Sequence, residues 1–331
     1  MLPPNGGIVR LLSAGAKRSI EQRQHGSLAL MAEKTRAQLT RRALLIGGGS
    51  AVVLAGAAVF AVDENILPGR STMFKMLGLD GSPGVIPKIA PGPMSTGSFV
   101  SKQRLNKTCG WAISYPPGSA PGDNLPVVIT LHGFGGSHGG GFTKNFALQR
   151  FQAQAVARGS HPFAIASVDG GSSYWHKRVT GEDAGAMVID EFIPLLAGRG
   201  LTTSRVGLLG WSMGGFGALF LASQLGAARC AVVVAESPAI WFNADQAAHG
   251  AFDSPADFAA HTPLGKQKEL DGIDVRVDCG TGDGFYPVAQ KYVEGFSKHP
   301  AGGFVAGAHN AGYWRGRAPE QLKLVAQSLS K

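Results

Sequence analysis

Cysteine and charged residues are both scarce in this chain of 331 residues. The three cysteines, Cys109, Cys230 and Cys279, cannot all pair within one chain, which excludes a disulfide-stapled scaffold. Buried free thiols and a single disulfide both remain open, and the cysteine spacing fits no zinc site, so no metal is expected. Charged residues form 16% of the chain and hydrophobic residues 44%, which excludes a mainly disordered protein and allows a substantial core.

Basic residues are concentrated at one end of the chain. Residues 1–62 hold eight Lys/Arg and two acidic residues, so they carry +6 of the net charge of +9 and leave +3 for residues 63–331. No run rich in lysine and arginine occurs beyond residue 62. A nucleic acid is therefore not expected as a partner.

Residues 1–62 are organised like an N-terminal leader. Arg41 and Arg42 precede an uncharged segment, residues 43–62, and this pattern resembles a twin-arginine export signal. A segment of about 20 apolar residues can also span a bilayer, so a cleaved signal and a retained membrane anchor are both open. In either case the basic residues keep the N-terminus in the cytoplasm, and we expect the rest of the chain outside it, secreted or attached to the cell envelope. Met31 offers an alternative start.

The chain changes character twice after the leader. Residues 63–97 are rich in proline and glycine and show little periodicity, which predicts a tether with one short helix near residues 72–79. From Ser98 onwards strand and helix patterns alternate without an internal repeat, so residues 98–331 are expected to form one domain.

The alternation within residues 98–331 predicts one doubly wound, mostly parallel sheet flanked by helices. A small helical excursion fits between Pro238 and Gly272, but a large lid domain does not. Strands are expected at 98–105, 109–115, 125–131, 163–168, 205–210, 230–235, 274–279 and 303–308, and helices near 145–157, 184–196, 215–223, 288–297 and 319–328.

Gly210-Trp211-Ser212-Met213-Gly214 is the motif with the clearest chemical meaning. It has the pattern Gly-x-Ser-x-Gly between an expected strand and a helix of small residues, the arrangement that raises a serine hydroxyl on a tight turn. A glycine-rich chain can produce this pattern by accident, so a passive serine in a turn is the alternative. We predict that Ser212 is a nucleophile.

A serine nucleophile needs a base and an acid that orients it, and in this architecture the chain order is serine, acid, histidine. His309 directly follows the last expected strand and is the predicted base, with a loop-stabilising histidine as the alternative. Asp283 lies in a glycine loop past the preceding strand and is the predicted acid. Glu236 is the second candidate, and Asp278 is expected to order the loop through backbone amides.

The negative charge that develops on a substrate oxygen requires preorganised donors. The amide of Met213, directly after the serine, is one predicted donor. The other is expected from the loop Leu131–Gly136, with Phe134 preferred and Gly133 next. A phosphate-binding loop is the alternative, but no Lys-Ser/Thr pair follows.

Aromatic residues surround these positions in the sequence, and they are candidates for a substrate pocket. For the loop after residue 168 and the segment after His309, a role in capping the core is equally consistent with the sequence. The candidate pocket residues are His132, Tyr174, Trp175, Trp211 and Trp314.

Taken together, residues 98–331 resemble the putative-esterase branch of the α/β-hydrolases, which includes S-formylglutathione hydrolase (esterase D) and secreted mycolyltransferases. The resemblance rests on Leu131-His-Gly133, Gly210–Leu219, Cys279–Asp283 and Ala308–Trp314. It implies the α/β-hydrolase fold, nucleophile Ser212, acid Asp283, base His309 and no cofactor. Trp211 stands where the formylglutathione enzymes commonly have histidine, and an export signal also departs from those cytosolic enzymes.

The expected function is an exported serine esterase that hydrolyses small-molecule or lipid esters through an acyl-enzyme intermediate. An acyltransferase that passes the acyl group to a sugar or envelope alcohol is one alternative. A non-catalytic envelope protein that binds its ligand on the same fold is the other.

Overall fold

The computed structural model describes residues 70–331, which belong to one compact unit, Leu67–Lys331. The twin arginines and the uncharged segment that follows them lie outside the described residues. Within residues 70–331, no helix has both the length and the apolar character needed to cross a membrane.

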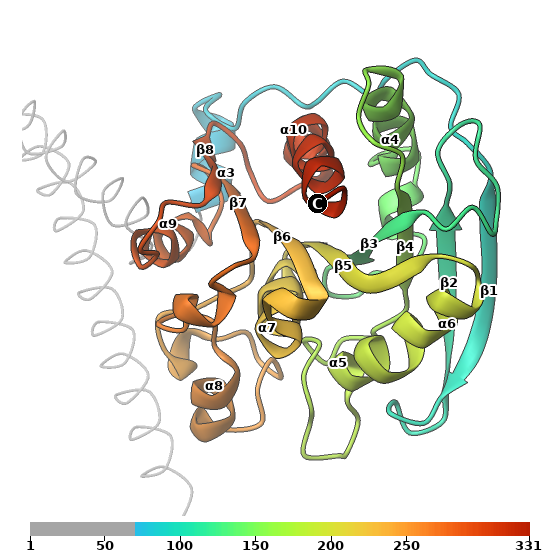
Figure 1. The fold of residues 1–331 in the computed structure, drawn as a ribbon. Helices are drawn as coiled ribbons and strands as arrows, with labels where there is room; N and C mark the ends of the chain where they lie inside the picture. The colour runs from blue at the N-terminus through green and yellow to red at the C-terminus, as the bar shows by residue number, and fades with distance from the viewer. Residues whose placement is uncertain (1–69) are drawn as a thin grey trace, which may run out of the picture. The chain divides into compact units, whose positions relative to one another are not determined.

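An eight-stranded sheet forms the centre of the domain, in the order β1-β2-β4-β3-β5-β6-β7-β8 (Figure 1). Strands β3 to β8 pair in parallel, whereas β1 and β2 form an antiparallel hairpin and β2 also runs antiparallel to β4. The strands are β1 Met94–Ser101, β2 Lys107–Ser114, β3 Pro126–Leu131, β4 Ala164–Val168, β5 Thr202–Trp211, β6 Cys230–Glu236, β7 Asp274–Gly280 and β8 Ala301–Val305. The predicted doubly wound, mostly parallel sheet is confirmed.

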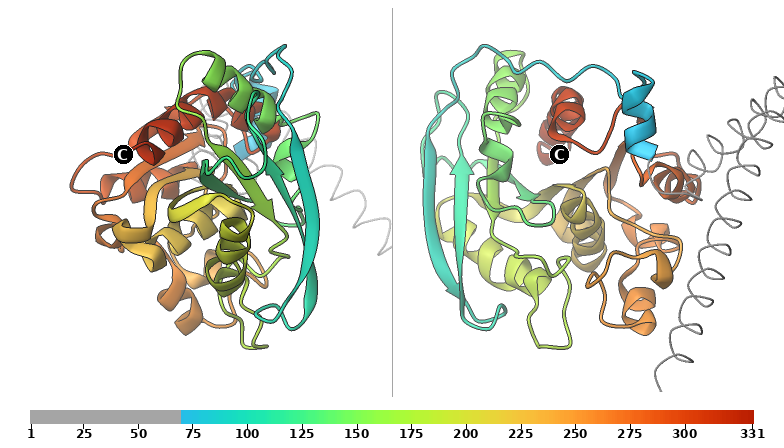
Figure 2. Two further views of the ribbon diagram at one scale, coloured as in Figure 1. Left: turned by 45° about the vertical axis from the view of Figure 1, so that its right-hand side comes forward. Right: turned by 180° about the vertical axis from the view of Figure 1, so that it is seen from behind.

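Helices cover both faces of the sheet, with α4 and α10 side by side on one face and α5, α6 and α7 on the other (Figures 1 and 2). The helices are α3 Arg70–Met76, α4 Leu148–Ala157, α5 Ala184–Ala186, α6 Ile193–Gly198, α7 Met213–Arg229, α8 Pro255–His261, α9 Tyr286–Glu294 and α10 Ala311–Leu329. A π-helical turn, η2 Met187–Phe192, joins α5 to α6, and 3₁₀ turns lie at η1 Gly140–Phe142, η3 Ala244–Gln246 and η4 Gln267–Leu270.

Two hydrophobic cores result from the alternation of side chains along the central strands. In β3, Val127 and Ile129 are buried in the core beneath α7, while Val128 is buried in the core beneath α4 and α10. Strands buried on both faces are apolar at nearly every position, which is why the sequence pattern identified them. The expected small excursion is also present as η3, α8 and η4, with no large lid.

Helix α10 begins earlier than expected. The sequence predicted a start at Pro319, because proline is common in the first turn of a helix. The structure starts α10 at Ala311, where the Asn310 side chain accepts a hydrogen bond from the Tyr313 N–H at 3.0 Å. Trp314 therefore lies on a helix rather than in a loop.

The segment predicted as a tether is held against the domain over part of its length. β1 already begins at Met94, and α3 occupies part of the expected short helix. Between them, Gly84 N–H donates to the carbonyl of Gly312 at 2.8 Å, and the Arg150 guanidinium donates to the carbonyl of Ile89 at 2.9 Å. These bonds attach the segment to the first turn of α10 and to α4.

The cysteines are all buried. Cys109 and Cys230 are free thiols, so for these two residues the reading as buried thiols holds. Burial raises the pKa of the Cys230 thiol to about 12, which leaves it protonated and unreactive at neutral pH.

Candidate active site

Ser212 occupies a strained turn between β5 and α7, with φ 58° and ψ −123°. Such a conformation is costly for a residue with a side chain and persists only where the surroundings enforce it. Here the Ser212 N–H donates to the carbonyl of Glu236 at 2.9 Å, and the Ser212 carbonyl accepts from Ala239 N–H at 3.0 Å. The backbone of the turn is thus fixed to the end of β6.

The two glycines of the motif are required by close approach of the backbone. A Cβ atom on Gly210 would lie 2.0 Å from the carbonyl oxygen of Gly214. A Cβ atom on Gly214 would lie 1.9 Å from the carbonyl oxygen of Leu131. Both distances are far inside van der Waals contact, so the pattern Gly-x-Ser-x-Gly is dictated by the packing of this turn.

The structure brings the three predicted residues Ser212, His309 and Asp283 together. His309 Nε2 lies 2.9 Å from Ser212 Oγ, and His309 Nδ1 lies 2.8 Å from Asp283 Oδ2. The Asp283 side chain is only 1% exposed, while that of His309 is 29% exposed. The other carboxylate oxygen of Asp283 accepts from the Phe285 N–H at 2.9 Å, so the acid is held by its own loop.

The predicted oxyanion donors lie beside the serine. Met213 is the first residue of α7, and the N–H of a first helical residue has no acceptor within its helix. On the opposite side, a Cβ atom on Gly133 would lie 3.4 Å from Ser212 Cβ, so the loop after β3 passes next to Ser212. Phe134 follows in that loop, with its side chain 65% exposed.

His132 is buried, and its prediction as a pocket residue is wrong. Its exposed fraction is 2%. Its Nδ1 is 2.8 Å from the carbonyl of Gly133, and its Nε2 accepts from the Gly170 N–H at 3.0 Å. Burial lowers the pKa of His132, which matches a neutral ring with one donor and one acceptor. The residue connects the oxyanion loop to the loop after β4.

Trp175 is likewise a core residue rather than a pocket residue. It is fully buried, and Cβ atoms on Gly170 and Gly217 would fall 2.2 and 2.4 Å from its ring. Its neighbour Tyr174 is 5% exposed, and its ring lies 6.2 Å from the exposed ring of Phe134. Both residues of this pair contact the loop after β3, Trp175 through the buried ring of His132 at 5.0 Å and Tyr174 through the exposed ring of Phe134.

Trp211 and Trp314 form a second aromatic wall. Trp211 is 6% exposed and packs edge-on against Phe146 with ring centres 4.9 Å apart. The Trp314 ring meets the His309 ring edge-on at 5.2 Å, and its Nε1 donates to Ser237 Oγ at 3.1 Å. Trp314 is therefore a direct neighbour of the base.

Sequence reasoning missed the partner of Trp314 on the other side of the base. The ring of Phe285 lies 5.4 Å from that of His309. Trp241, from the segment after β6, packs edge-on against Phe285 at 5.6 Å. The available signal for Phe285 was its place two residues after Asp283, in the same loop.

Glu236 and Asp278 lie side by side on β6 and β7. Glu236 is fully buried, and burial together with the neighbouring Asp278 carboxylate raises its pKa well above the usual range. Asp278 does not bind backbone amides as predicted. Its carboxylate pairs with the Arg276 guanidinium at 2.6 and 3.0 Å and accepts from the Gln321 amide at 3.0 Å. The acid that is hydrogen-bonded to His309 is Asp283 and not either of these two.

A serine on the β5–α7 turn, an acid after β7 and a histidine after β8 on a doubly wound sheet define the α/β-hydrolase fold. Residues 102–317 match the protein family described as "Esterase: Putative esterase". Because the match covers most of the chain, the chain belongs to this family, and it is a serine hydrolase of the carboxylesterase type.

Solved structures share the fold. A ferulic acid esterase aligns with a TM-score of 0.61 at 18% identity, covering 72% of this chain and 99% of that one. An S-formylglutathione hydrolase from Agrobacterium tumefaciens aligns with a TM-score of 0.55 at 17% identity, covering 75% and 100%. A fluorophosphonate-binding serine hydrolase of Staphylococcus aureus also gives 0.55, at 14% identity, covering 73% and 100%. A search of curated protein sequences finds no match.

Proposed function

We propose that the chain is an exported serine esterase whose nucleophile is Ser212, activated by His309 and Asp283. The observation that carries this proposal is the hydrogen-bonded series from Asp283 Oδ2 through the His309 ring to Ser212 Oγ, with distances of 2.8 and 2.9 Å. A nucleophile within reach of a base, which is itself oriented by a buried acid, is the arrangement that activates a serine hydroxyl.

The first half of the reaction is acylation. Ser212 Oγ attacks the ester carbonyl while His309 Nε2 takes its proton. The imidazolium that forms is stabilised by the Asp283 carboxylate, whose burial leaves it little solvent screening. The amides of Met213 and Phe134 donate to the oxyanion, and each such donor typically contributes about 3–4 kcal/mol to lowering the barrier. His309 then protonates the leaving alcohol, and the acyl group stays on Ser212.

Deacylation repeats these steps with water. His309 removes a proton from a water molecule, which attacks the acyl-serine carbonyl, and then returns a proton to Ser212 Oγ. The same geometry would serve an alcohol acceptor. Product analysis with and without an added alcohol therefore separates a hydrolase from an acyltransferase.

The rim of the site favours an ester with an aromatic or other flat apolar portion. Phe134, in the loop beside Ser212, is 65% exposed, and its ring lies 6.2 Å from that of Tyr174. Tyr174 and Trp241, whose rings are 5.8 Å apart, support this surface from below. One of the proteins that share the fold is a ferulic acid esterase, and ferulic acid is an aromatic acid. Esters of hydroxycinnamic acids are thus the first substrates to assay.

Replacing Ser212 with alanine tests the proposal. We expect Ser212→Ala to lose hydrolysis of p-nitrophenyl acetate and labelling by a fluorophosphonate probe, with unchanged circular dichroism. Ser172→Ala is the matched control, because Ser172 is an exposed serine near the same rim. Undiminished turnover or labelling in Ser212→Ala would refute the assignment. A wild-type protein that is folded yet unreactive towards both reagents would instead favour a binding protein on this fold.

A further inference from the structure

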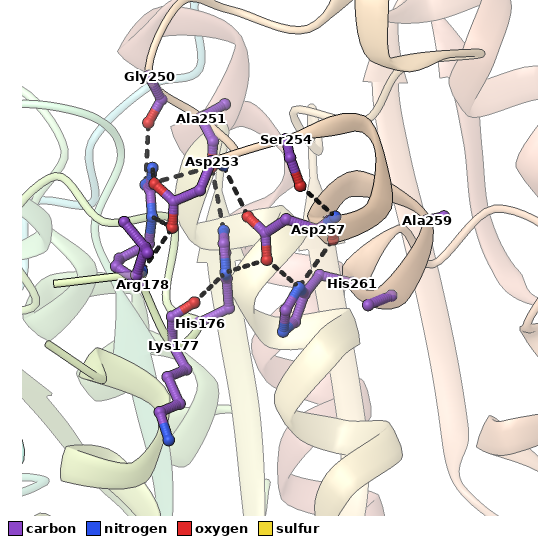
Figure 3. Close-up of polar contacts among 12 residues, drawn as sticks. His176, Lys177, Arg178, Gly250, Ala251, Asp253, Ser254, Asp257, Ala259 and His261 are labelled. Atoms are coloured by element: carbon purple, nitrogen blue, oxygen red, sulfur yellow. Dashed lines mark hydrogen bonds and ion pairs between the residues drawn. The ribbon is translucent and has the colours of Figure 1, made fainter. Parts of the chain in front are cut away.

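A second group of chemically capable side chains lies outside the triad, between the loop after β4 and helix α8 (Figure 3). The ligand atoms of His176, Asp257 and His261 lie within 4.8 Å of one another. Figure 3 shows the Asp257 carboxylate beside both imidazoles. Its Oδ1 is 2.9 Å from His261 Nδ1 and 3.9 Å from His176 Nδ1. None of these residues takes part in the proposed ester hydrolysis.

His176 is oriented as a metal ligand would be. It is fully buried, and its Nε2 lies 3.0 Å from the carbonyl of Ala251. A neutral ring that donates through Nε2 presents a lone pair at Nδ1, and metal-bound histidines usually donate their second ring nitrogen in this way. That lone pair faces the carbonyl of Lys177 at 2.9 Å and the Asp257 carboxylate. Several electron-rich atoms therefore converge, which is unfavourable unless a cation or proton lies among them.

His261 lies on the other side of the Asp257 carboxylate and faces it through Nδ1. Its Nδ1 is within 2.8 Å of the carbonyl of Asp257 and 2.9 Å of the Asp257 carboxylate. The His176 and His261 rings stack with centres 4.3 Å apart, so two imidazolium charges at these positions would repel each other.

We propose that His176 Nδ1, Asp257 Oδ1 and His261 Nδ1 bind a divalent transition-metal ion of the Zn²⁺ class. Imidazole is a borderline-soft ligand and carboxylate a hard one, and Zn²⁺ binds both. Two imidazoles, one carboxylate and a water molecule would give it four ligands. Ca²⁺ and Mg²⁺ prefer sites built wholly from oxygen ligands. The site is distinct from the triad and goes beyond the proposed esterase function.

The surrounding contacts give the site a second layer. The Asp253 N–H donates to the other Asp257 oxygen at 2.8 Å, and the Asp253 carboxylate pairs with Arg178 through two contacts of 3.1 and 2.6 Å. Such outer contacts hold the ligand groups in position. They connect the loop after β4 with the segment that leads into α8.

The ion would stabilise one wall of the active site. Phe252 stacks on His176 with ring centres 5.3 Å apart, and it contacts Trp241 edge-on at 6.0 Å. Trp241 in turn contacts Phe285, which lies against His309. Packed side chains thus run without interruption from the proposed ion to the base. The role assigned to the ion is structural, because its ligands are joined to His309 through the rings of Phe252, Trp241 and Phe285.

Metal binding by the untagged full chain tests the proposal directly. Protein treated with EDTA and dialysed is titrated with Zn²⁺ by isothermal calorimetry, and its metal content is measured by inductively coupled plasma mass spectrometry. We expect one equivalent of Zn²⁺ per chain. At a free Zn²⁺ concentration 100 times Kd, we expect the Tm to rise by roughly 5–10 °C. Ca²⁺ and Mg²⁺ at the same concentration should give no shift.

Conservative variants assign the ligands. His261→Gln and Asp257→Asn change partly exposed side chains, and each should weaken Zn²⁺ binding at least about 10-fold while circular dichroism stays native. His249→Gln is the control, because His249 is an exposed histidine of the same excursion and is not in the group. It should bind Zn²⁺ like the wild type. Absence of binding by the wild type, or wild-type binding by both ligand variants, would overturn the proposal. Neither readout depends on whether Ser212 is a nucleophile.

Discussion

Replacing Asp283 with asparagine should nearly abolish ester hydrolysis without changing the geometry of the site. In the wild type, one carboxylate oxygen accepts from the Phe285 N–H at 2.9 Å and the other accepts from His309 Nδ1 at 2.8 Å. An asparagine can place its carbonyl oxygen towards the Phe285 N–H. Its NH₂ group then faces His309 Nδ1, which must act as the acceptor.

This reversal moves the proton of the neutral His309 ring to Nε2. That nitrogen is 2.9 Å from Ser212 Oγ, and once protonated it cannot take the serine proton. The same change in a comparable triad lowers kcat about 10⁴-fold, which corresponds to about 5.4 kcal/mol in activation free energy. We expect a loss of this size in Asp283→Asn, with KM nearly unchanged because no substrate contact is removed.

Glu236→Gln is the matched comparison, since Glu236 was the other candidate acid. Burial and the neighbouring Asp278 carboxylate raise the pKa of Glu236 well above its usual range, which favours its neutral form, and glutamine is a neutral side chain of similar shape. Its kcat should stay within about threefold of the wild type, a change below about 1 kcal/mol. Steady-state hydrolysis of p-nitrophenyl acetate measures both variants, and urea unfolding checks that both are folded. If Glu236→Gln lost activity while Asp283→Asn retained a tenth or more, the assignment of the acid would be wrong.

Three further predictions concern the turn, the oxyanion loop and the leader. Gly214→Ala should destabilise the fold by about 3 kcal/mol, because its Cβ would lie 1.9 Å from a backbone oxygen. Urea unfolding compares this variant with Gly198→Ala, where the added atom meets nothing within 4 Å, and equal stabilities of the two variants would contradict the prediction. Burial lowers the pKa of His132 from 6.5, so below about pH 6.5 the unfolded chain binds a proton that the folded chain excludes, and the stability should fall as the pH drops. Thermal unfolding from pH 5 to 8 should show a smaller change of Tm with pH for His132→Gln than for the wild type, and an identical change would refute this. Replacement of both Arg41 and Arg42 by lysine should stop export, whereas Arg36→Lys should not, and cell fractionation measures both variants. Equal export of the two variants would refute the twin-arginine hypothesis.

The sheet could be predicted because its signal is local. Continuous apolar runs such as residues 125–131 and 230–235 identify strands buried on both faces. The positions of Ser212, Asp283 and His309 were predicted from their order along the chain and from their places after strands. The carboxyl ends of parallel strands meet at one edge of a sheet, so sequence order alone implied that they would be close.

The misassigned residues depend on contacts that local sequence does not contain. His132 and Trp175 follow strand ends like the triad residues, but both turn inwards. His132 accepts a hydrogen bond from the Gly170 N–H, and Trp175 fills the space left by Gly170 and Gly217. Helix α10 starts early because its buried face, including Ala318 and Leu322, packs on the sheet. That packing outweighs the cost of Pro319 within the helix. Ring contacts between distant segments, such as Phe285 with His309, leave no periodic pattern.

The capped start of α10 has a consequence for the timing of assembly during synthesis. The serine turn is complete once β5, α7 and β6 exist, whereas His309 is fixed between β8 and a helix whose packing extends to Val325. About 89 residues separate the end of β6 from Val325, so at translation rates of about 5–20 residues per second roughly 4–18 seconds separate these two events. During that interval the part of the chain that has been made contains Ser212 but not the complete helix that packs beside His309. The residues proposed for hydrolysis are therefore held together only once the last helix of the chain has been made.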